Sequence, residues 1–213
     1  MRALADADYQ ALRQGAEVIE ADASGDKVLR LADGNFIKLF RRKRLVTSAA
    51  LLPYARRFAL NAGHLARRGI PCPTILAIWR VPSIRRDLVH YQPLPGSTLR
   101  QVIAAGEGSE ALLAQLGAFV ARLHEGGVYF RSLHLGNVVR TPSGELGLID
   151  LADMRAYPWA LRAGLCLRNF QHMLRYEQDR DWLMQGGGVA FLQAYAQHSS
   201  KPWNSERLAK RLG

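Results

Sequence analysis

The sequence has 213 residues, of which 48% are hydrophobic, and its 29 Lys and Arg residues outnumber 18 Asp and Glu residues to give a formal net charge of +11. This length and composition allow one large domain or two small lobes with a real core, and they exclude a disordered or fibrous chain. No apolar run approaches the roughly 18 residues of a membrane span, and the first ten residues include acidic ones where a signal peptide would be apolar, so we expect a cytoplasmic protein.

The first third of the chain predicts a small antiparallel sheet. Alternation of apolar and polar residues, together with the turn formers around residues 22–26 and at Asp33-Gly34, indicates consecutive strands joined by tight connections. We predict a short helix over 4–14 and strands over 17–22, 27–31 and 35–40.

A helix and two further strands follow. Thr47 or Ser48 can cap a helix that runs to about Arg68, although Pro53 is an alternative first turn, and Gly69 ends the helix. Beyond it, we predict strands over 74–79 and 87–91.

The second half predicts mainly helices. The connector 93–96, Pro-Leu-Pro-Gly, divides the chain into an N-terminal lobe over 1–92 and a C-terminal lobe over 93–213. Residues 110–124 have helical apolar spacing, and 133–140 with 146–151 indicate a small hairpin. The sequence therefore predicts an α+β fold.

The excess positive charge is concentrated in one region, because no acidic residue lies between Asp33 and Asp87. Such a region attracts anionic partners, and glycolipid phosphates, an anionic membrane surface or nucleic acid all fit its sign. A solvated face without a partner is the plain alternative. We do not expect nucleic acid, because aromatic residues are not interleaved with the basic ones.

Three residues indicate phosphate and metal chemistry. Asn137 leaves a loop before one short strand, and Asp150 ends the next, so their oxygens could hold one Mg²⁺ that bridges nucleotide phosphates. Lys38 ends the third predicted strand, from which an ammonium could hold phosphate oxygens. Taken singly, each residue is more simply an edge charge, a turn former or a helix cap.

In this order the motifs resemble the protein-kinase-like fold, and most closely the lipopolysaccharide kinases, the Kdo and heptose kinases that include toluene tolerance proteins. The resemblance extends over nearly the whole chain. Its segments are Asn35-Phe36-Ile37-Lys38, the stretches 68–73 and 91–96, the run 123–137, and the closing helix 168–175.

The resemblance implies an ATP- and Mg²⁺-dependent kinase with a two-lobed fold that phosphorylates a sugar of the lipopolysaccharide core or a related glycolipid, in the cytoplasm or peripherally at the inner membrane. Lys38 would bind phosphates, Asn137 and Asp150 would hold Mg²⁺, and the hinge backbone at Gln92 and Leu94 would contact adenine. The implied catalytic residues are Arg131, Ser132, His134 and Asp150, with His134 where many kinases have a phosphate-contacting lysine.

Two departures from the kinase pattern support an alternative, a pseudokinase that acts as a binding or regulatory module. Ser132 stands where kinases have the catalytic Asp, and a hydroxyl cannot serve as a carboxylate base. His134 is one candidate replacement. The helix after the third strand has no acidic residue to pair with Lys38, which leaves Asn61, Glu20 and Asp150 as candidate partners. Arg168, His172 and Arg175 share one helical face, suited to a phosphate or sugar or to surface salt bridges.

Overall fold

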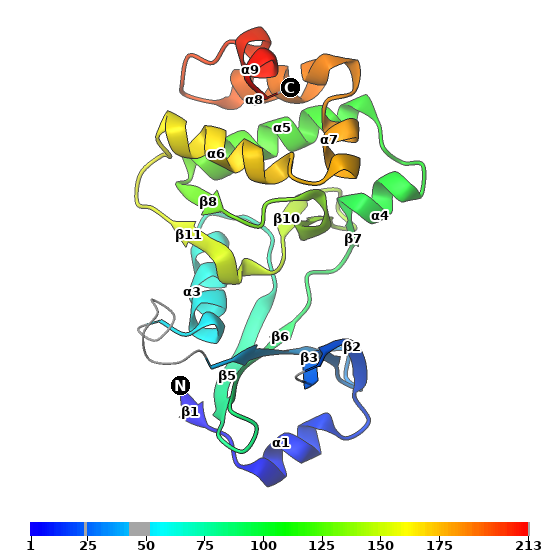
Figure 1. The fold of residues 1–213 in the computed structure, drawn as a ribbon, viewed down its shortest axis with the longest axis vertical. Coiled ribbons are helices and arrows are strands. Elements are labelled where there is room, and N and C mark those ends of the chain that lie inside the picture. The colour runs from blue at the N-terminus through cyan, green and yellow to red at the C-terminus, as the bar shows by residue number, and fades with distance from the viewer. Residues whose placement is uncertain (24, 43–51, 213) are drawn as a thin grey trace. The chain divides into compact units, whose positions relative to one another are not determined.

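The computed structural model describes residues 1–23, 25–42 and 52–212, and the chain forms two compact units (Figure 1). The first unit contains Met1–Leu94 together with Leu151–Asp153, and the second contains Pro95–Asp150 and Met154–Gly213. The sequence division into 1–92 and 93–213 did not include the return of Leu151–Asp153 to the first unit.

A six-stranded sheet forms the centre of the first unit. Its strand order is β1-β5-β6-β4-β3-β2, and every neighbouring pair is antiparallel except β1 and β5. The predicted strands are all present, and the two-residue β1 is additional. The strands are β1 (Arg2–Ala3), β2 (Glu17–Asp22), β3 (Gly25–Arg30), β4 (Phe36–Arg41), β5 (Thr74–Val81) and β6 (Arg86–Gln92).

The two faces of this sheet are covered by different helices. On β4, Ile37 and Leu39 are buried in a cluster with Tyr9 of α1 (Asp6–Arg13). Alternate residues point to opposite faces of a strand, so Phe40 lies on the other face. There its ring packs 6.3 Å from Phe58 of α3 (Tyr54–Ala66). Lys38 is two residues from Phe40 on the same strand, so it also lies on the α3 face.

Helix α3 begins after Pro53, the later of the starting points considered from the sequence. Pro53 precedes the first turn with an extended backbone, and the alternative caps Thr47 and Ser48 lie outside the described residues. At the other end, Gly69 adopts a positive φ of 63°, and the Ile70 amide donates to the Leu65 carbonyl at 3.0 Å. This left-handed glycine closes the helix, as the sequence predicted.

The second unit is mainly helical. Ser109 caps α5 (Glu110–Glu125) by accepting a hydrogen bond from the Leu112 amide at 3.2 Å. Gly117 lets α5 approach α8 closely, because a Cβ at this position would lie 2.2 Å from the Phe191 carbonyl oxygen. The other helices are α4 (Leu99–Ala104), α6 (Ala163–Met173), α7 (Glu177–Leu183), α8 (Val189–His198) and α9 (Ser205–Leu212).

Short strands and tight turns connect these helices. The predicted hairpin is formed by β9 and β10, and β9 also pairs with β7, while β8 pairs with β11. No helix in the described part of the chain is both long and apolar enough to cross a membrane. The strands are β7 (Ser97–Thr98), β8 (Val128–Phe130), β9 (Val138–Arg140), β10 (Leu146–Leu148) and β11 (Met154–Ala156).

A buried polar network joins α5, α6 and α8. His124 is fully buried, and its Nδ1 lies 2.9 Å from the Tyr195 hydroxyl while its Nε2 lies 3.3 Å from Asn169 Oδ1. The Asn169 amide in turn donates to the Phe130 carbonyl at 2.7 Å. Burial lowers the pKa of His124 to about 4, so the imidazole is neutral at physiological pH.

We expect protonation of His124 to weaken the fold as the pH falls. In the unfolded chain His124 takes up a proton near its ordinary pKa of 6.5, whereas in the folded chain it does so only near about 4. Between these pH values the unfolded state binds more protons, so the free energy of unfolding decreases as the pH falls. Urea unfolding at about pH 7.5 and about pH 5 should show a His124 contribution of about 2 kcal/mol. The variant His124→Gln should lose that part of the pH dependence, and an unchanged slope would contradict the assignment.

Candidate functional site

The loop that follows β8 is anchored to α6 before it reaches the predicted catalytic residues. Asn169 of α6 clamps Phe130 at the end of β8, because its amide donates to the Phe130 carbonyl and its Oδ1 accepts from the Phe130 amide at 3.3 Å. Arg131 then lies exposed, Ser132 half-buried and Leu133 buried. The loop ends in the short helical turn η1 (Leu135–Asn137), which leads into β9.

The side chain of Asn137 is fixed in one orientation. It is buried, with 7% of its surface exposed, and its Nδ2 donates to the Ser132 carbonyl at 2.9 Å. The same Nδ2 lies 3.2 Å from His134 Nε2. A flipped amide would place Oδ1 against the Ser132 carbonyl, where two acceptors would face each other, so the hydrogen bonds select the orientation that leaves Oδ1 as the atom for a further ligand.

His134 holds Asn137 in place. Since the amide nitrogen of Asn137 is a donor, His134 Nε2 must be the acceptor, and the ring proton then resides on Nδ1. That Nδ1 is buried and has no hydrogen-bond partner among the described residues. Burial lowers the pKa of His134, and Arg100 lowers it further, which favours this neutral form. His134 thus contacts the side chain of Asn137 through Nε2. Its service as a replacement base stays a prediction.

Asp150 is joined to Asn137 through its neighbour in the chain. The Ile149 amide donates to the Asn137 carbonyl at 3.0 Å, so the residue before Asp150 is hydrogen-bonded to the loop. Asp150 has a positive φ of 55°, which is uncommon for a residue with a side chain and is found at ligand-binding positions. The second unit by itself thus brings the predicted metal ligands Asn137 and Asp150 to adjacent backbone positions.

The donor set at this position fits Mg²⁺. Among residues 1–23, 25–42 and 52–212, no group of three His, Cys, Asp or Glu side chains is arranged to hold a metal. Mg²⁺ is commonly bound by one or two protein oxygens together with substrate phosphates and water, and Asn137 Oδ1 with the Asp150 carboxylate would supply such a pair.

An ion pair that was not predicted supports the loop from the opposite side. Arg100 of α4 donates from Nε and Nη2 to the two carboxylate oxygens of Asp179 on α7, at 2.8 and 3.0 Å. Asp179 Oδ2 also accepts from the Leu135 amide at 3.0 Å. Tyr176 completes the support, with its ring 5.2 Å from the His134 ring. The ion-pair partners are 79 residues apart, so no local sequence signal marks them.

Lys38 belongs to the first unit. It is half-buried on the central strand β4, paired in register with Val28 of β3 and Val89 of β6, and its Nζ lies 5.9 Å from the Phe40 ring. One candidate partner from the sequence is taken elsewhere, because Glu20 pairs with Lys27 at 3.0 Å. The meeting of Lys38 with Asn137 and Asp150 stays a prediction.

Asn61 of α3 contacts the segment that follows Asp150. Its Nδ2 donates to the Leu151 carbonyl at 2.7 Å, and the Asn61 side chain is 6% exposed. This hydrogen bond ties the returning residues Leu151–Asp153 to α3 within the first unit. The residue that the sequence nominated as a polar partner of Lys38 therefore has a definite second role, which is to fix the backbone immediately after Asp150.

The predicted hinge contains one position that requires glycine. Gln92 ends β6 in register with Thr74, and Leu94 is the last residue of the main segment of the first unit. Gly96 follows in the second unit with a φ of 128°, and a Cβ there would lie 2.1 Å from the Arg140 carbonyl oxygen. Gly96 thus allows the connector to pass close to β9. Contact of Gln92 and Leu94 with a nucleotide stays a prediction.

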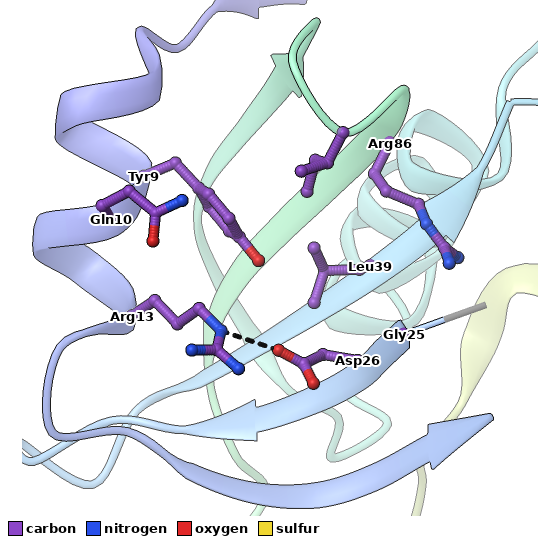
Figure 2. Close-up of a pocket in the computed structure, with 8 residues that line it drawn as sticks. Tyr9, Gln10, Arg13, Gly25, Asp26, Leu39 and Arg86 are labelled. Carbon is purple, nitrogen blue, oxygen red and sulfur yellow. Dashed lines mark hydrogen bonds and ion pairs between the residues drawn. The ribbon is translucent and has the colours of Figure 1, made fainter. Parts of the chain in front are cut away.

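A cavity of about 360 Å³ lies on the α1 face of the sheet, as Figure 2 shows. Tyr9 and Arg13 of α1 line it opposite Leu39, and Arg13 Nε donates to Asp26 Oδ2 at 2.8 Å. Since Leu39 and Lys38 point to opposite faces of β4, this cavity is separated from Lys38 by the sheet. It is therefore not the nucleotide site predicted for Lys38.

Solved structures of one protein, WbdD, are similar to 88% of this chain. They are a co-crystal structure with the kinase inhibitor LY294002 (18% identity, TM-score 0.45), a high-resolution crystal structure (18%, 0.46), and a structure described as the bifunctional kinase-methyltransferase (17%, 0.47). The chain spans 42%, 47% and 46% of those structures, which is less than half of each. No curated protein matches the sequence.

The sheet with α3, the glycine connector, the loop before β9 and the following helices together define a protein-kinase-like α+β fold, which confirms the predicted fold class. Residues 15–131, more than half of the chain, match the family described as the phosphotransferase enzyme family. The chain belongs to this family, and its predicted class as a phosphotransferase is confirmed. The matched segment includes Lys38 and ends at Arg131, one residue before Ser132.

Proposed function

We propose that this protein is an ATP- and Mg²⁺-dependent kinase that phosphorylates a hydroxyl of a lipopolysaccharide core sugar. One observation carries the metal-dependent part. The amide of Asn137 is locked by Ser132 and His134 so that Oδ1 is left for a cation, and Asp150 follows a residue hydrogen-bonded to Asn137. Membership of the phosphotransferase enzyme family supports transfer of a phosphoryl group.

In this proposal each residue has a stated task. Asn137 Oδ1 and the Asp150 carboxylate hold Mg²⁺, which when bound neutralises charge on the nucleotide phosphates. Lys38 binds phosphate oxygens, and the backbone at Gln92 and Leu94 contacts the adenine base. Ser132 orients the acceptor hydroxyl by hydrogen bonding, since positioning and charge neutralisation supply most of the acceleration in phosphoryl transfer.

The lipopolysaccharide substrate rests on the resemblance to the Kdo and heptose kinases and on the charge of the first unit. Between Asp33 and Asp87 there are twelve Lys and Arg residues and no Asp or Glu. Arg80 pairs with the carboxylate of Asp87, at the border of that stretch, at 3.2 Å. A surface of this sign suits a peripheral position at an anionic inner membrane, where the glycolipid acceptor would be encountered.

The second candidate is a pseudokinase that binds nucleotide or a partner without transferring phosphate. The residue that favours it is Ser132, because the ordinary position of the catalytic carboxylate holds a hydroxyl. The two candidates agree on the Asn137–Asp150 site and differ only in the chemistry, so one set of measurements separates them.

ATP should bind in a Mg²⁺-dependent manner, which calorimetric titration of the purified protein with and without Mg²⁺ will measure. We expect Lys38→Ala and Asp150→Asn each to weaken binding at least about tenfold, since each removes a charge-assisted contact. Asn tolerates the positive φ at position 150, so the second variant removes charge without straining the backbone. Lys210→Ala and Asp181→Ala, both at exposed positions, are matched controls and should bind normally.

Transfer of radiolabelled phosphate from ATP to core oligosaccharide then separates kinase from pseudokinase. Transfer by the wild type that is lost in Asp150→Asn supports the kinase. Mg²⁺-dependent binding without transfer to any core sugar supports the pseudokinase. No binding at millimolar ATP contradicts the kinase and favours a pseudokinase that acts as a module for binding a partner.

A further inference from the structure

Three arginines and a histidine of the second unit converge beside the candidate catalytic loop. Arg168 and His172 lie on one face of α6, and Arg175 lies in the turn two residues beyond its end, at the spacing that continues this face. Arg131 extends the group from the loop, one residue before Ser132. Arg131, Arg168 and Arg175 are exposed, and His172 is half-buried among them. We call these four residues the α6 cluster.

Two tethers fix the α6 cluster relative to the loop. The Tyr129 hydroxyl on β8 lies 3.0 Å from His172 Nε2. One turn earlier, Asn169 forms its paired hydrogen bonds with the backbone of Phe130. Both tethers hold the register of α6 against the strand that leads into Arg131. The cations therefore have a defined place beside Ser132 that depends on the second unit alone.

The positive charge of the α6 cluster is not compensated. In the part of the chain that the structure describes, Arg131, Arg168 and Arg175 form no ion pair with a carboxylate, whereas the nearby Asp179 and Glu125 are paired with Arg100 and Lys201. Burial lowers the pKa of His172, and the three arginines lower it further, while no acidic group opposes them. Guanidinium groups gathered around one histidine are suited to bind phosphate or carboxylate oxygens.

A further cation lies on the same side of the β8–β11 ribbon. Arg155 of β11 is directly opposite Tyr129 in the antiparallel pair, and residues paired in this way point to the same face. Since Tyr129 points toward His172 of α6, the exposed Arg155 borders the α6 cluster and enlarges the positive surface beside the loop.

We propose that the α6 cluster binds an anionic substituent, a phosphate or a carboxylate, of the acceptor sugar and so places the acceptor hydroxyl at Ser132. This inference rests on the proposed kinase function and narrows its substrate class from sugars to anionic sugars. Neutral sugars of the same size lack the group that the arginines bind, and they would be poor acceptors.

Three matched sugars test this site in the intact protein: glucose, glucuronate and glucose 6-phosphate, at constant ionic strength. Binding is followed by NMR of the arginine Nε–H signals, which also reports where the sugar binds. We expect at least one anionic sugar to bind about tenfold or more tightly than glucose and to shift the Arg168 and Arg175 signals. The two anionic probes distinguish a carboxylate from a phosphate as the group bound.

The double variant Arg168→Gln/Arg175→Gln should lose this preference for anionic sugars. Arg207→Gln, an exposed arginine of α9, is the control for loss of charge alone. Equal affinity for glucose and both anionic sugars in the wild type, or an equal loss of preference in the control, overturns the proposal. ATP titration of the same samples keeps the two proposals apart: a preserved anion preference without ATP binding supports the anion site while it counts against the kinase.

Discussion

The variant Asp179→Ala is expected to lower the free energy of unfolding by about 3 kcal/mol, because it removes one partner of a buried ion pair. Asp179 is 1% exposed and Arg100 31% exposed by side chain, so the guanidinium left behind would still be largely desolvated. The substitution also leaves the buried Leu135 amide without its acceptor. Urea unfolding measures the loss, and Asp181→Ala on the exposed side of α7 is the matched control, expected to change stability by less than about 0.5 kcal/mol.

The same substitution should also loosen the candidate metal site. The Leu135 amide is held by Asp179 at the start of the turn that ends at Asn137, so its release allows the turn to shift. The folded variant should then bind Mg²⁺ and ATP more weakly than wild type. A loss of stability no larger than in Asp181→Ala would show that the ion pair contributes little to the fold.

The helices and strands with strong local patterns were predictable from the sequence. The helix over 110–124 and the strands on either side of Asp33-Gly34 needed only apolar periodicity and turn residues, and both lie where predicted. Elements with weak local sequence patterns were not predicted. β1 and β7 have two residues each, so periodicity cannot mark them, and α4 depends on a capping box formed by Thr98 and Gln101.

Some features of the candidate site were likewise predictable from the sequence, and others were not. Asn137 and Asp150 were recognisable from the sequence because each follows or precedes a short apolar strand, and the hairpin between them fixes their proximity. The interactions that hold them were not recognisable. Arg100 with Asp179 and Asn61 with Leu151 join residues 79 and 90 positions apart, and an arginine or asparagine within a helix carries no sign of its distant partner. The contact between His134 and Asn137 was also not predicted from the sequence, where His134 was considered as a base or a phosphate ligand.

Ser132→Asp is expected to accelerate phosphoryl transfer by about a hundredfold, since a positioned general base typically contributes 10² to 10⁴ in rate. The backbone at this position is already fixed, because the Ser132 carbonyl accepts the hydrogen bond from Asn137, so a carboxylate can be introduced without rebuilding the loop. ATP affinity should change little, because the new group acts on the acceptor hydroxyl. Single-turnover transfer to core oligosaccharide measures the chemical step directly.

Ser132→Ala is the matched comparison, and it separates two ways in which the present residue could act. If the hydroxyl orients the acceptor, removing it should slow transfer several-fold while ATP binding stays constant. If Ser132→Asp is no faster than wild type and Ser132→Ala no slower, the chemistry does not depend on this side chain, and positioning by the metal ligands and Lys38 would have to account for the whole rate. Acceleration in the Asp variant of an otherwise inactive protein would instead identify the wild type as a pseudokinase that has lost only its base.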